Sequence, residues 1–339
     1  MSLRLLISVL FMSFAVPASA FDPVPIAEST VAQWRAWMNK WGIKEGAIVV
    51  AYEGEVVLES GISRTVDDPA KVASLSKAIT AVCALHAADA AGKDFKAPLA
   101  EVIPAALAAH PPANAAFADI TIGQLITHKS GITSTYHRRE LAKLKTFQKE
   151  NKLWQFSKFV TEDLSGATGF REYAYSNANY LALGLVIEEL SGEGYEEYCK
   201  REILDPLGIT TAKLNDNWRV MTSWGGWEIS ARDYLTFAEA TFKGENSVDK
   251  PGGFTLFSGS MSRGRSYGAG VIFRRAFPNP NIWHSGSWIG VKGRVTDPFG
   301  SQFGLYDNGF SIVTNFKHDA WDSEVRNELD ALLYNATHP

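Results

Sequence analysis

The sequence predicts an α+β fold in which one antiparallel sheet is built from both ends of the chain, is flanked by helices and carries an inserted, mainly helical lobe. Strand-like segments occur near the start and again late in the chain, whereas the interval from about 93 to 215 is mostly helix and loop. No repeat, low-complexity tract or proline-rich linker divides the 339 residues. We therefore expect one catalytic domain over 21–339, with an α/β lobe at about 21–92 and 216–339 and a helical lobe at about 93–215.

The individual elements follow from local patterns. Val31–Trp41 has a helical pattern, and the apolar runs Ala47–Tyr52 and Val56–Glu59 lie on either side of Gly54, which indicates a hairpin. The late strands are expected at Tyr267–Phe273, Val291–Thr296, Gln302–Tyr306 and Phe310–Asn315. The stretch Trp321–Tyr334 closes the chain as a helix. These elements place strands at both chain ends.

The first 20 residues have the pattern of a signal peptide. Arg4 supplies the positive charge, Leu5–Val16 is an apolar run, and Ala18-Ser19-Ala20 is a small-residue cleavage site. The apolar run is shorter than the roughly 20 residues that span a bilayer. We therefore expect cleavage before Phe21, a secreted or periplasmic protein, and no stable membrane anchor.

Charge and motif content narrow the class of function. The formal net charge is −4, and it becomes −5 when Arg4 is removed with the leader, so nucleic acid is not an expected partner. The sequence contains no HExxH, no tight His/Cys cluster and no dinucleotide glycine fingerprint. We expect no metal and no cofactor. Cys83 and Cys199 both fall in helical stretches, where two buried free thiols are favoured over the alternative of a disulfide.

The segment Ser74-Leu75-Ser76-Lys77 carries the strongest chemical signal. It precedes the alanine-rich helical run Ala78–Ala91, which Gly92 ends. On a helix, residues three apart lie about 5–6 Å apart at Cβ, so the hydroxyl and the amine share one face, near the positive end of the helix dipole. A solvated Ser/Lys pair is the alternative. A second copy, Ser247-Val248-Asp249-Lys250, runs into the loop Pro251-Gly252-Gly253 and lacks a helix.

Two further motifs follow in order along the chain. Tyr175-Ser176-Asn177 precedes the amphipathic stretch Ala178–Leu190, and His284-Ser285-Gly286 precedes Ser287 in a strand-like region. An SxxK, a YxN and a third [K/H]xG element in this order resemble the penicillin-recognising serine hydrolases. That family includes class C β-lactamases, D-alanyl-D-alanine carboxypeptidases, and esterase and D-aminopeptidase relatives. The resemblance extends from about Ala47 to Phe316 and implies the β-lactamase/transpeptidase-like version of the predicted fold.

The resemblance implies a role for each motif residue. Ser74 attacks a carbonyl and forms an acyl-enzyme that water later cleaves. Lys77 can act as its base if burial or a nearby cation lowers the lysine pKa. Tyr175 is the second candidate base, and Asn177 offers an amide to Lys77 and to a substrate carbonyl. Outside this family, Tyr175 would be an ordinary half-buried aromatic and Asn177 a turn residue. Whether Lys77 or Tyr175 is the base stays open.

The third element departs from the Lys-Thr-Gly of class C β-lactamases. His284 is more similar to the carboxypeptidase and D-aminopeptidase branch, and this puts efficient β-lactam hydrolysis in doubt. We expect Ser285 to bind a substrate carboxylate and Gly286 to allow close approach of the strand. The backbone N–H groups of Ser287 and Ser74 would form the oxyanion hole. Because histidine titrates near neutrality, His284 is expected to make binding depend on pH, with a structural histidine as the alternative.

Specificity residues are less clearly marked. Arg274 and Arg275 end a strand-like run before His284, and either can reach a substrate carboxylate or be a solvated strand end. Three tryptophans flank the motifs and either line an acyl pocket or belong to the core: Trp224, Trp227 and Trp288. His128 belongs to the segment Leu125-Ile126-Thr127-His128-Lys129-Ser130-Gly131, which also resembles the family. We interpret it as structural support.

The resemblance implies a secreted serine hydrolase that acts on an amide or ester through an acyl-enzyme. The favoured substrate is a D-amino-acid peptide or small ester, with weak or no β-lactamase activity. The alternatives are a class C-like β-lactamase and a non-hydrolytic penicillin-binding sensor or scaffold. The expected partner is a small-molecule or peptide substrate, and the oligomeric state stays open.

Overall fold

The computed structural model describes residues 21–112, 114–132, 172–216, 222–243, 259–261, 263–276, 279–288, 298–318 and 323–339. Three sequence expectations lie outside these ranges: the leader at 1–20, the strand Val291–Thr296 and the second SxxK copy at Ser247. None of the helices in the described ranges combines the length and apolar character needed to cross a membrane.

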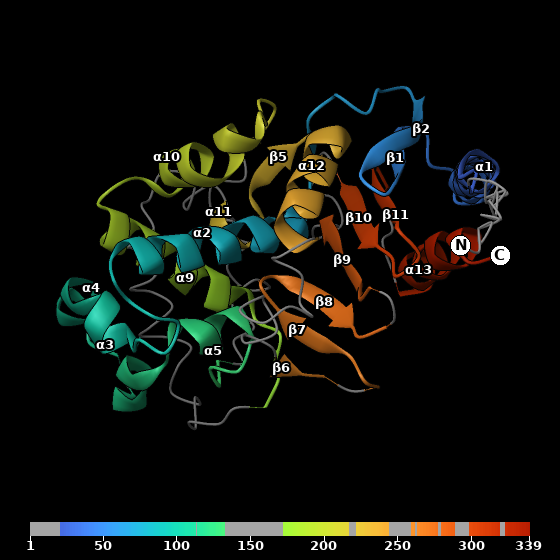
Figure 1. The fold of residues 1–339 in the computed structure, drawn as a ribbon. Coiled ribbons are helices and arrows are strands. Elements are labelled where there is room, and N and C mark those ends of the chain that lie inside the picture. Colours follow the sequence, from blue (N-terminus) through green and yellow to red (C-terminus); the bar gives the residue numbers. More distant parts are fainter. Residues whose placement is uncertain are drawn as a thin grey trace, which may run out of the picture.

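The main sheet is antiparallel and joins both chain ends. In the described chain its strand order is β2-β1-β11-β10-β9-β8-β7-β6 (Figure 1). The strands are β1 (Gly46–Tyr52), β2 (Glu55–Ile62), β6 (Gly259–Ser260), β7 (Ser266–Gly268), β8 (Val271–Arg274), β9 (Asn281–Trp288), β10 (Phe299–Leu305) and β11 (Phe310–Phe316). β1 pairs with β11 from Gly46 opposite Phe316 to Tyr52 opposite Phe310. The predicted α+β fold class is confirmed.

Two turns of this sheet follow from backbone conformation. The predicted hairpin around Gly54 is present, and both Glu53 and Gly54 have positive φ, as a two-residue turn between antiparallel strands requires. The run Tyr267–Phe273 was expected as one strand, and that expectation is wrong. Ala269 and Gly270 also have positive φ and break the run into β7 and β8.

One face of the sheet is covered by the terminal helices α1 (Val24–Lys40) and α13 (Ser323–Thr337), which pack together (Figure 1). Their apolar side chains and those of β1 and β11 form one core cluster that includes Trp34, Trp37, Ile312 and Leu329. α1 begins at Val24, directly after Pro23, rather than at the predicted Val31, because proline is favoured at a helix start even where apolar periodicity is weak.

The opposite face packs on α12 (Ala231–Phe242) and leads into the helical lobe (Figure 1). The lobe contains α3 (Leu99–Val102), α4 (Pro104–Ala109), α5 (Ile122–Ile126), α9 (Asn177–Ser191) and α10 (Tyr195–Cys199). A second, small sheet is formed by β3 (Ala70–Lys71), β5 (Trp227–Ile229) and β4 (Lys213–Leu214), with β5 in the middle.

Helix α2 (Ser76–Ala90) packs against the helical lobe. Its alanines Ala78, Ala81, Ala84 and Ala88 are buried, and their small side chains let α2 pack closely on α9. Gly92, with φ of 65°, follows the C-cap Ala91 and ends the helix as predicted. The packing of both helices fixes the start of α2 in space, and this start carries the SxxK motif.

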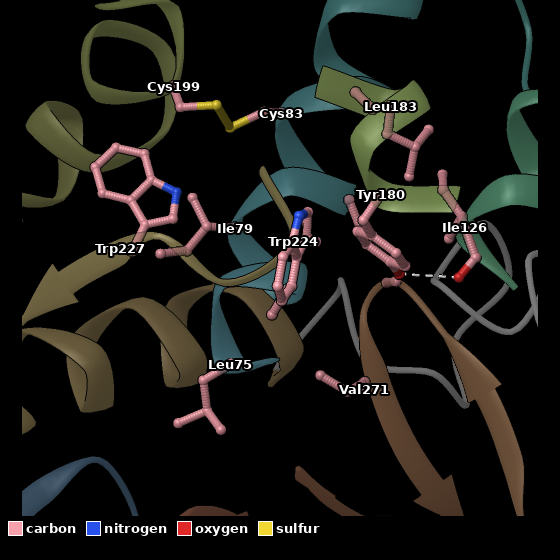
Figure 2. Close-up of a cluster of buried hydrophobic side chains, with 14 of the residues drawn as sticks. Leu75, Ile79, Cys83, Ile126, Tyr180, Leu183, Cys199, Trp224, Trp227 and Val271 are labelled. Carbon is pink, nitrogen blue, oxygen red and sulfur yellow. Dashed lines mark hydrogen bonds between the residues drawn. A yellow bond between two sulfur atoms is a disulfide. The ribbon is translucent and has the colours of Figure 1, made fainter. Parts of the chain in front are cut away.

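The two cysteines form a disulfide, so the prediction of two free thiols is wrong. Cys83 on α2 and Cys199 on α10 face each other (Figure 2), with 5.5 Å between their Cα atoms. That distance lies within the normal range for a disulfide. The bridge joins residues 116 apart in sequence. It ties the helix that carries the SxxK motif to α10.

We expect the double variant Cys83→Ala/Cys199→Ala to unfold more easily than the wild type. Removing the cross-link gives the unfolded chain more conformational freedom, with an effect of about 2–4 kcal/mol. Urea denaturation of the oxidised wild type, the reduced wild type and the variant measures this. Equal midpoints for oxidised and reduced wild type would show that the bridge does not stabilise the fold.

Candidate active site

Ser74 lies in a tight 3₁₀ turn, Ala73–Leu75, that leads directly into α2. Ala73 has a φ of 45°, an uncommon conformation for a residue with a side chain. Lys77 follows on the first turn of α2, and its Nζ lies 3.2 Å from Ser74 Oγ. The predicted pairing of hydroxyl and amine on one side of the helix start is present. Strained backbone next to a reactive side chain is a common feature of active sites.

Tyr175 approaches Ser74 from the other lobe. Its hydroxyl donates to Ser74 Oγ over 3.0 Å. Tyr175 stands just before α9, because the Ser176 side chain caps that helix by accepting from the Ala178 N–H. The motif residues Ser74, Lys77 and Tyr175, far apart in the sequence, therefore meet at one oxygen atom.

Lys77 is fully buried, with an exposed fraction of 0%. Its Nζ donates to the backbone carbonyl of Trp224 over 2.7 Å and lies 5.0 Å from the centre of the Tyr175 ring. Burial lowers the pKa of this amine well below its ordinary value, because the charged form loses its hydration. The neutral amine is thus favoured far more than in an exposed lysine.

The Trp224 carbonyl is held in place by α11 (Thr222–Gly225), which is fastened to α2. Thr80 Oγ1 donates to the Ser223 carbonyl, and the Trp227 N–H donates to Ser76 Oγ over 3.1 Å. This acceptor for Lys77 was not predicted, because a main-chain carbonyl leaves no mark in the pattern of side chains. The only available signal was the position of Trp224 among the tryptophans that flank the motifs.

Tyr175 has an exposed fraction of 43%, so the site is open to solvent on that side. Desolvation raises the pKa of its phenol, and the hydrogen bond with Ser74 partly offsets this. The hydroxyl is therefore protonated at neutral pH and acts as the donor to Ser74. Asn177, the first residue of α9, presents a buried Oδ1 with no hydrogen-bond partner in the described chain.

Gly286 brings β9 against the Ser74 turn. A Cβ at this position would contact the Val72 carbonyl, would lie 2.7 Å from Ser301 Oγ and would lie 3.0 Å from the Ser74 nitrogen. Ser301, opposite Gly286 on β10, also donates to the Val72 carbonyl over 2.8 Å. Only glycine permits this approach of the strand, as the sequence analysis expected.

We expect Gly286→Ala to lower kcat/KM by about a hundredfold, because its methyl group pushes the Ser74 turn away from β9 and a displacement of about 1 Å has that effect. Gly54→Ala is the control for destabilisation alone, since its added Cβ meets no atom within 4 Å but alanine is strained at its φ of 90°. Kinetics on a chromogenic ester and thermal unfolding of both variants measure the effect. Equal activity of Gly286→Ala and wild type would show that the close approach is not needed.

His284 is buried, and its pKa is lowered to about 3, mainly because burial disfavours the charged imidazolium. Its Nδ1 donates to the Ser285 carbonyl over 2.7 Å, and its Nε2 lies 3.3 Å from the Tyr267 hydroxyl. The expectation that His284 titrates near neutrality is wrong, because the pattern of the motif does not reveal burial. The imidazole is neutral at neutral pH.

Ser285 lies on the opposite face of β9 from His284. It stands opposite Gln302, whose side-chain amide donates to Asp330 of α13 over 2.9 Å, so strand alternation directs Ser285 toward the α13 side. That Ser285 binds a substrate carboxylate stays a prediction. Ser287 follows two residues later on β9 and shares that face, so only its backbone is a candidate for the oxyanion hole.

The two arginines that were predicted to reach the substrate lie away from the site. Arg274 pairs with Asn281, at the opposite end of β9 from Ser287, and its charge partly offsets the effect of burial on the pKa of Asp330. Arg275 is an exposed residue directly after β8. The structure thus places both arginines away from Ser74, at a solvated strand end.

The tryptophans divide between site and core. Trp288 is buried, and its ring centre lies 6.3 Å from that of Trp224, beside Lys77. Trp227 lies fully in the core, where its Nε1 donates to the Tyr195 hydroxyl over 2.8 Å. Figure 2 shows Trp224 and Trp227 on either side of Ile79. Trp224 and Trp288 therefore form one wall next to the amine.

Sequence reasoning missed a second layer of aromatic side chains. Tyr180 and Tyr267 are buried behind Lys77 and Tyr175, and the Tyr180 hydroxyl donates to the Ile126 carbonyl over 2.9 Å (Figure 2). Gly270 lies against the backbone of Lys77, and a Cβ on Gly270 would clash with it. The only signal in the sequence was the spacing of Tyr180 on the helix that follows Tyr175.

Comparison with known proteins agrees with this geometry. "Protein flp" of Staphylococcus aureus (strain MRSA252) is 26% identical over 189 residues, which are 53% of this chain and 36% of that protein. The chain thus spans little more than a third of this curated relative. A D-stereospecific amidohydrolase from Streptomyces sp. has a similar fold, with a TM-score of 0.67 and 20% identity over 89% of this chain and 97% of that chain.

A beta-lactamase/D-alanine carboxypeptidase from Pseudomonas syringae is also similar in fold, with a TM-score of 0.68 and 14% identity over 93% of this chain and 100% of that chain. The family model described as Beta-lactamase matches residues 35–335. This match includes all three motifs and nearly all of the described residues. The chain therefore belongs to the beta-lactamase family of serine hydrolases.

Proposed function

We propose that this protein is a secreted or periplasmic serine hydrolase that cleaves a small amide or ester through an acyl-enzyme on Ser74. The observation that carries the proposal is the meeting of two groups at one nucleophile. Ser74 Oγ lies 3.2 Å from the Lys77 amine and accepts from the Tyr175 hydroxyl over 3.0 Å. A scaffold that only binds ligands does not need this arrangement.

The two groups have different tasks because their pKa values shift in opposite directions. Burial lowers the pKa of Lys77 and raises that of Tyr175. The neutral amine of Lys77 takes the Ser74 proton as the hydroxyl attacks the carbonyl. Tyr175, still protonated, passes a proton to the leaving group and recovers one from Lys77. Water then cleaves the acyl-enzyme by the reverse sequence of transfers.

The negative charge that develops on the substrate oxygen is stabilised by backbone N–H groups of Ser74 and Ser287. The tight contact of Gly286 with the Ser74 turn supports this, because it brings the two backbones together. Asn177 supports substrate binding, since its buried Oδ1 has no partner in the described residues and can accept from a substrate N–H or from Lys77.

We propose a D-amino-acid amide or small ester as the substrate, with weak or no β-lactamase activity. The proposal is supported by the likeness in fold to a D-stereospecific amidohydrolase. It is also supported by the neutral state of His284, which stands where class C β-lactamases have a lysine and so provides no positive charge for a carboxylate.

Purified mature protein should be assayed against p-nitrophenyl esters, D- and L-amino-acid amides, D-Ala-D-Ala peptides and nitrocefin. We expect turnover of the esters and of D- over L-amides, with little or none of nitrocefin. Preferred turnover of nitrocefin would favour a β-lactamase. Covalent labelling by a penicillin without turnover of any substrate would favour a sensor.

The neutral state of His284 predicts a pH profile without a histidine step. Between pH 5 and pH 8, the ratio of kcat/KM for D-Ala-D-Ala to that for its C-terminal amide should stay constant. The reason is that His284, with a pKa of about 3, remains neutral throughout this range. A ratio that falls as the pH rises through about 6.5, the ordinary histidine pKa, would show that a protonated histidine binds the carboxylate.

A further inference from the structure

His128 lies directly behind the Tyr175 ring. It follows α5, is fully buried and has a φ of 55°, a conformation that histidine adopts more readily than most residues. The centres of the His128 and Tyr175 rings are 4.4 Å apart. The histidine therefore supports the face of the tyrosine that points away from solvent.

His128 also holds the backbone on both sides of Tyr175. The Ala174 N–H donates to the His128 carbonyl over 2.9 Å, and the Ser176 N–H donates to His128 Nδ1 over 3.3 Å. The residues on either side of Tyr175 are thus both hydrogen-bonded to His128. A shift of His128 would move the phenol relative to Ser74 Oγ.

These hydrogen bonds determine which nitrogen of His128 carries the proton. A backbone N–H can only donate, so Nδ1 must accept from Ser176. Asn179 Nδ2, 2.9 Å away, is then the second donor to Nδ1. Ser130 fixes the orientation of this amide, since its Oγ accepts from the Ile132 N–H over 3.0 Å and donates to Asn179 Oδ1 over 2.6 Å. The proton of His128 therefore sits on Nε2.

A second proton on Nδ1 would break both of these bonds. The surroundings oppose such protonation, because burial lowers the pKa of His128 well below its ordinary value, and a positive charge on Lys77 or His284 would lower it further. The titratable groups that pack around the ring are Tyr173, Tyr175, Tyr180, Tyr267, His284 and Lys77. Among them, no described side chain supplies an anion that would favour the imidazolium.

We propose that His128 is a positioning residue that holds the Tyr175 hydroxyl on Ser74, and that it does so as a neutral imidazole protonated on Nε2. The series of hydrogen bonds from Ile132 through Ser130 and Asn179 to His128 sets this tautomer. The inference rests on the proposed function, because it assigns His128 a task through Tyr175. His284 has the opposite tautomer, since its Nδ1 donates to a carbonyl.

A matched pair of variants tests the roles of Nδ1 and Nε2 of His128 separately. In His128→Asn, the side-chain oxygen takes the place of Nδ1 and can still accept from Ser176, and asparagine tolerates the positive φ. In His128→Gln, the longer amide takes the place of Nε2 and leaves the Ser176 N–H without its acceptor. The measurement is the rate of labelling of Ser74 by a fluorophosphonate and the final labelled fraction, together with kcat and KM for a p-nitrophenyl ester.

We expect His128→Asn to label within about tenfold of the wild-type rate, and His128→Gln to label about a hundredfold more slowly while every molecule is finally labelled. For the ester, kcat falls and KM changes little. Wild-type rates for His128→Gln, or equal losses in both variants, would overturn the proposal. A merely structural role would lower the labelled fraction instead of the rate.

Nitrogen-15 NMR of histidine-labelled wild type measures the tautomer directly, with the signals assigned by replacing the other histidines one at a time. We expect an unprotonated Nδ1 for His128 and a protonated Nδ1 for His284 at neutral pH. A protonated Nδ1 at His128 would overturn the proposal. A wild type that is not labelled at Ser74 would instead contradict the proposed function, so the two failures are distinguishable.

Discussion

Replacing Ser74 with alanine abolishes hydrolysis of esters and amides, with a loss of kcat of at least about 10⁴-fold. The loss is this large because the acyl-enzyme cannot form, and only substrate binding and the oxyanion hole remain. The backbone of the Ala73–Leu75 turn tolerates the change, since alanine removes Oγ and its hydrogen bonds with Lys77 and Tyr175 but keeps Cβ. The variant should be folded, as circular dichroism and thermal unfolding can verify.

Ser247→Ala is the matched control for this result. Ser247 belongs to the second SxxK copy and lies outside the described residues. We expect its kcat/KM to equal that of the wild type. Full activity in Ser74→Ala, or loss of activity in Ser247→Ala alone, would move the nucleophile to another residue.

Lys77→Met and Tyr175→Phe should each lower kcat/KM by about 10²–10⁴-fold, the usual contribution of a positioned proton-transfer group. Both groups contact the same Ser74 Oγ, so they act as one unit. The double variant should therefore lose far less than the product of the two single losses. Losses that multiply would show that the two side chains work independently.

The same Lys77→Met variant tests the protonation state of the amine through stability. Below about pH 10.4 the unfolded chain carries a proton on Lys77, whereas the folded chain does not carry it above the lowered pKa. Wild-type stability relative to Lys77→Met should thus rise with pH, by about 1.4 kcal/mol per pH unit between these two pKa values. A constant difference from pH 7 to pH 10 would indicate that the buried amine stays charged.

The features that could be predicted from the sequence depend on local patterns. The glycine after the alanine-rich run marks the end of α2, and the glycine at position 54 marks the first hairpin. The serine before α9 caps that helix and thereby places Tyr175. The order of the three motifs then implied that Ser74, Lys77 and Tyr175 meet, and the structure brings these three side chains together.

The features that could not be predicted depend on which elements become neighbours. Two cysteines on separate helices give no sign that α2 and α10 pack with their thiols facing each other. The pKa of His284 follows from its burial against Tyr267, which lies on another strand. The orientation of Ser285 follows from its register with Gln302. Each of these depends on tertiary packing, for which a single sequence carries no periodic signal.

The central claim is that Ser74 is the nucleophile activated by Lys77 and Tyr175. The most direct measurement is peptide mapping by mass spectrometry after the wild type has been inactivated with a fluorophosphonate. We predict one adduct per chain, on the peptide that contains Ser74, formed much more slowly in Lys77→Met. An adduct on any other residue, or continued turnover of an unlabelled enzyme in excess reagent, would contradict the account.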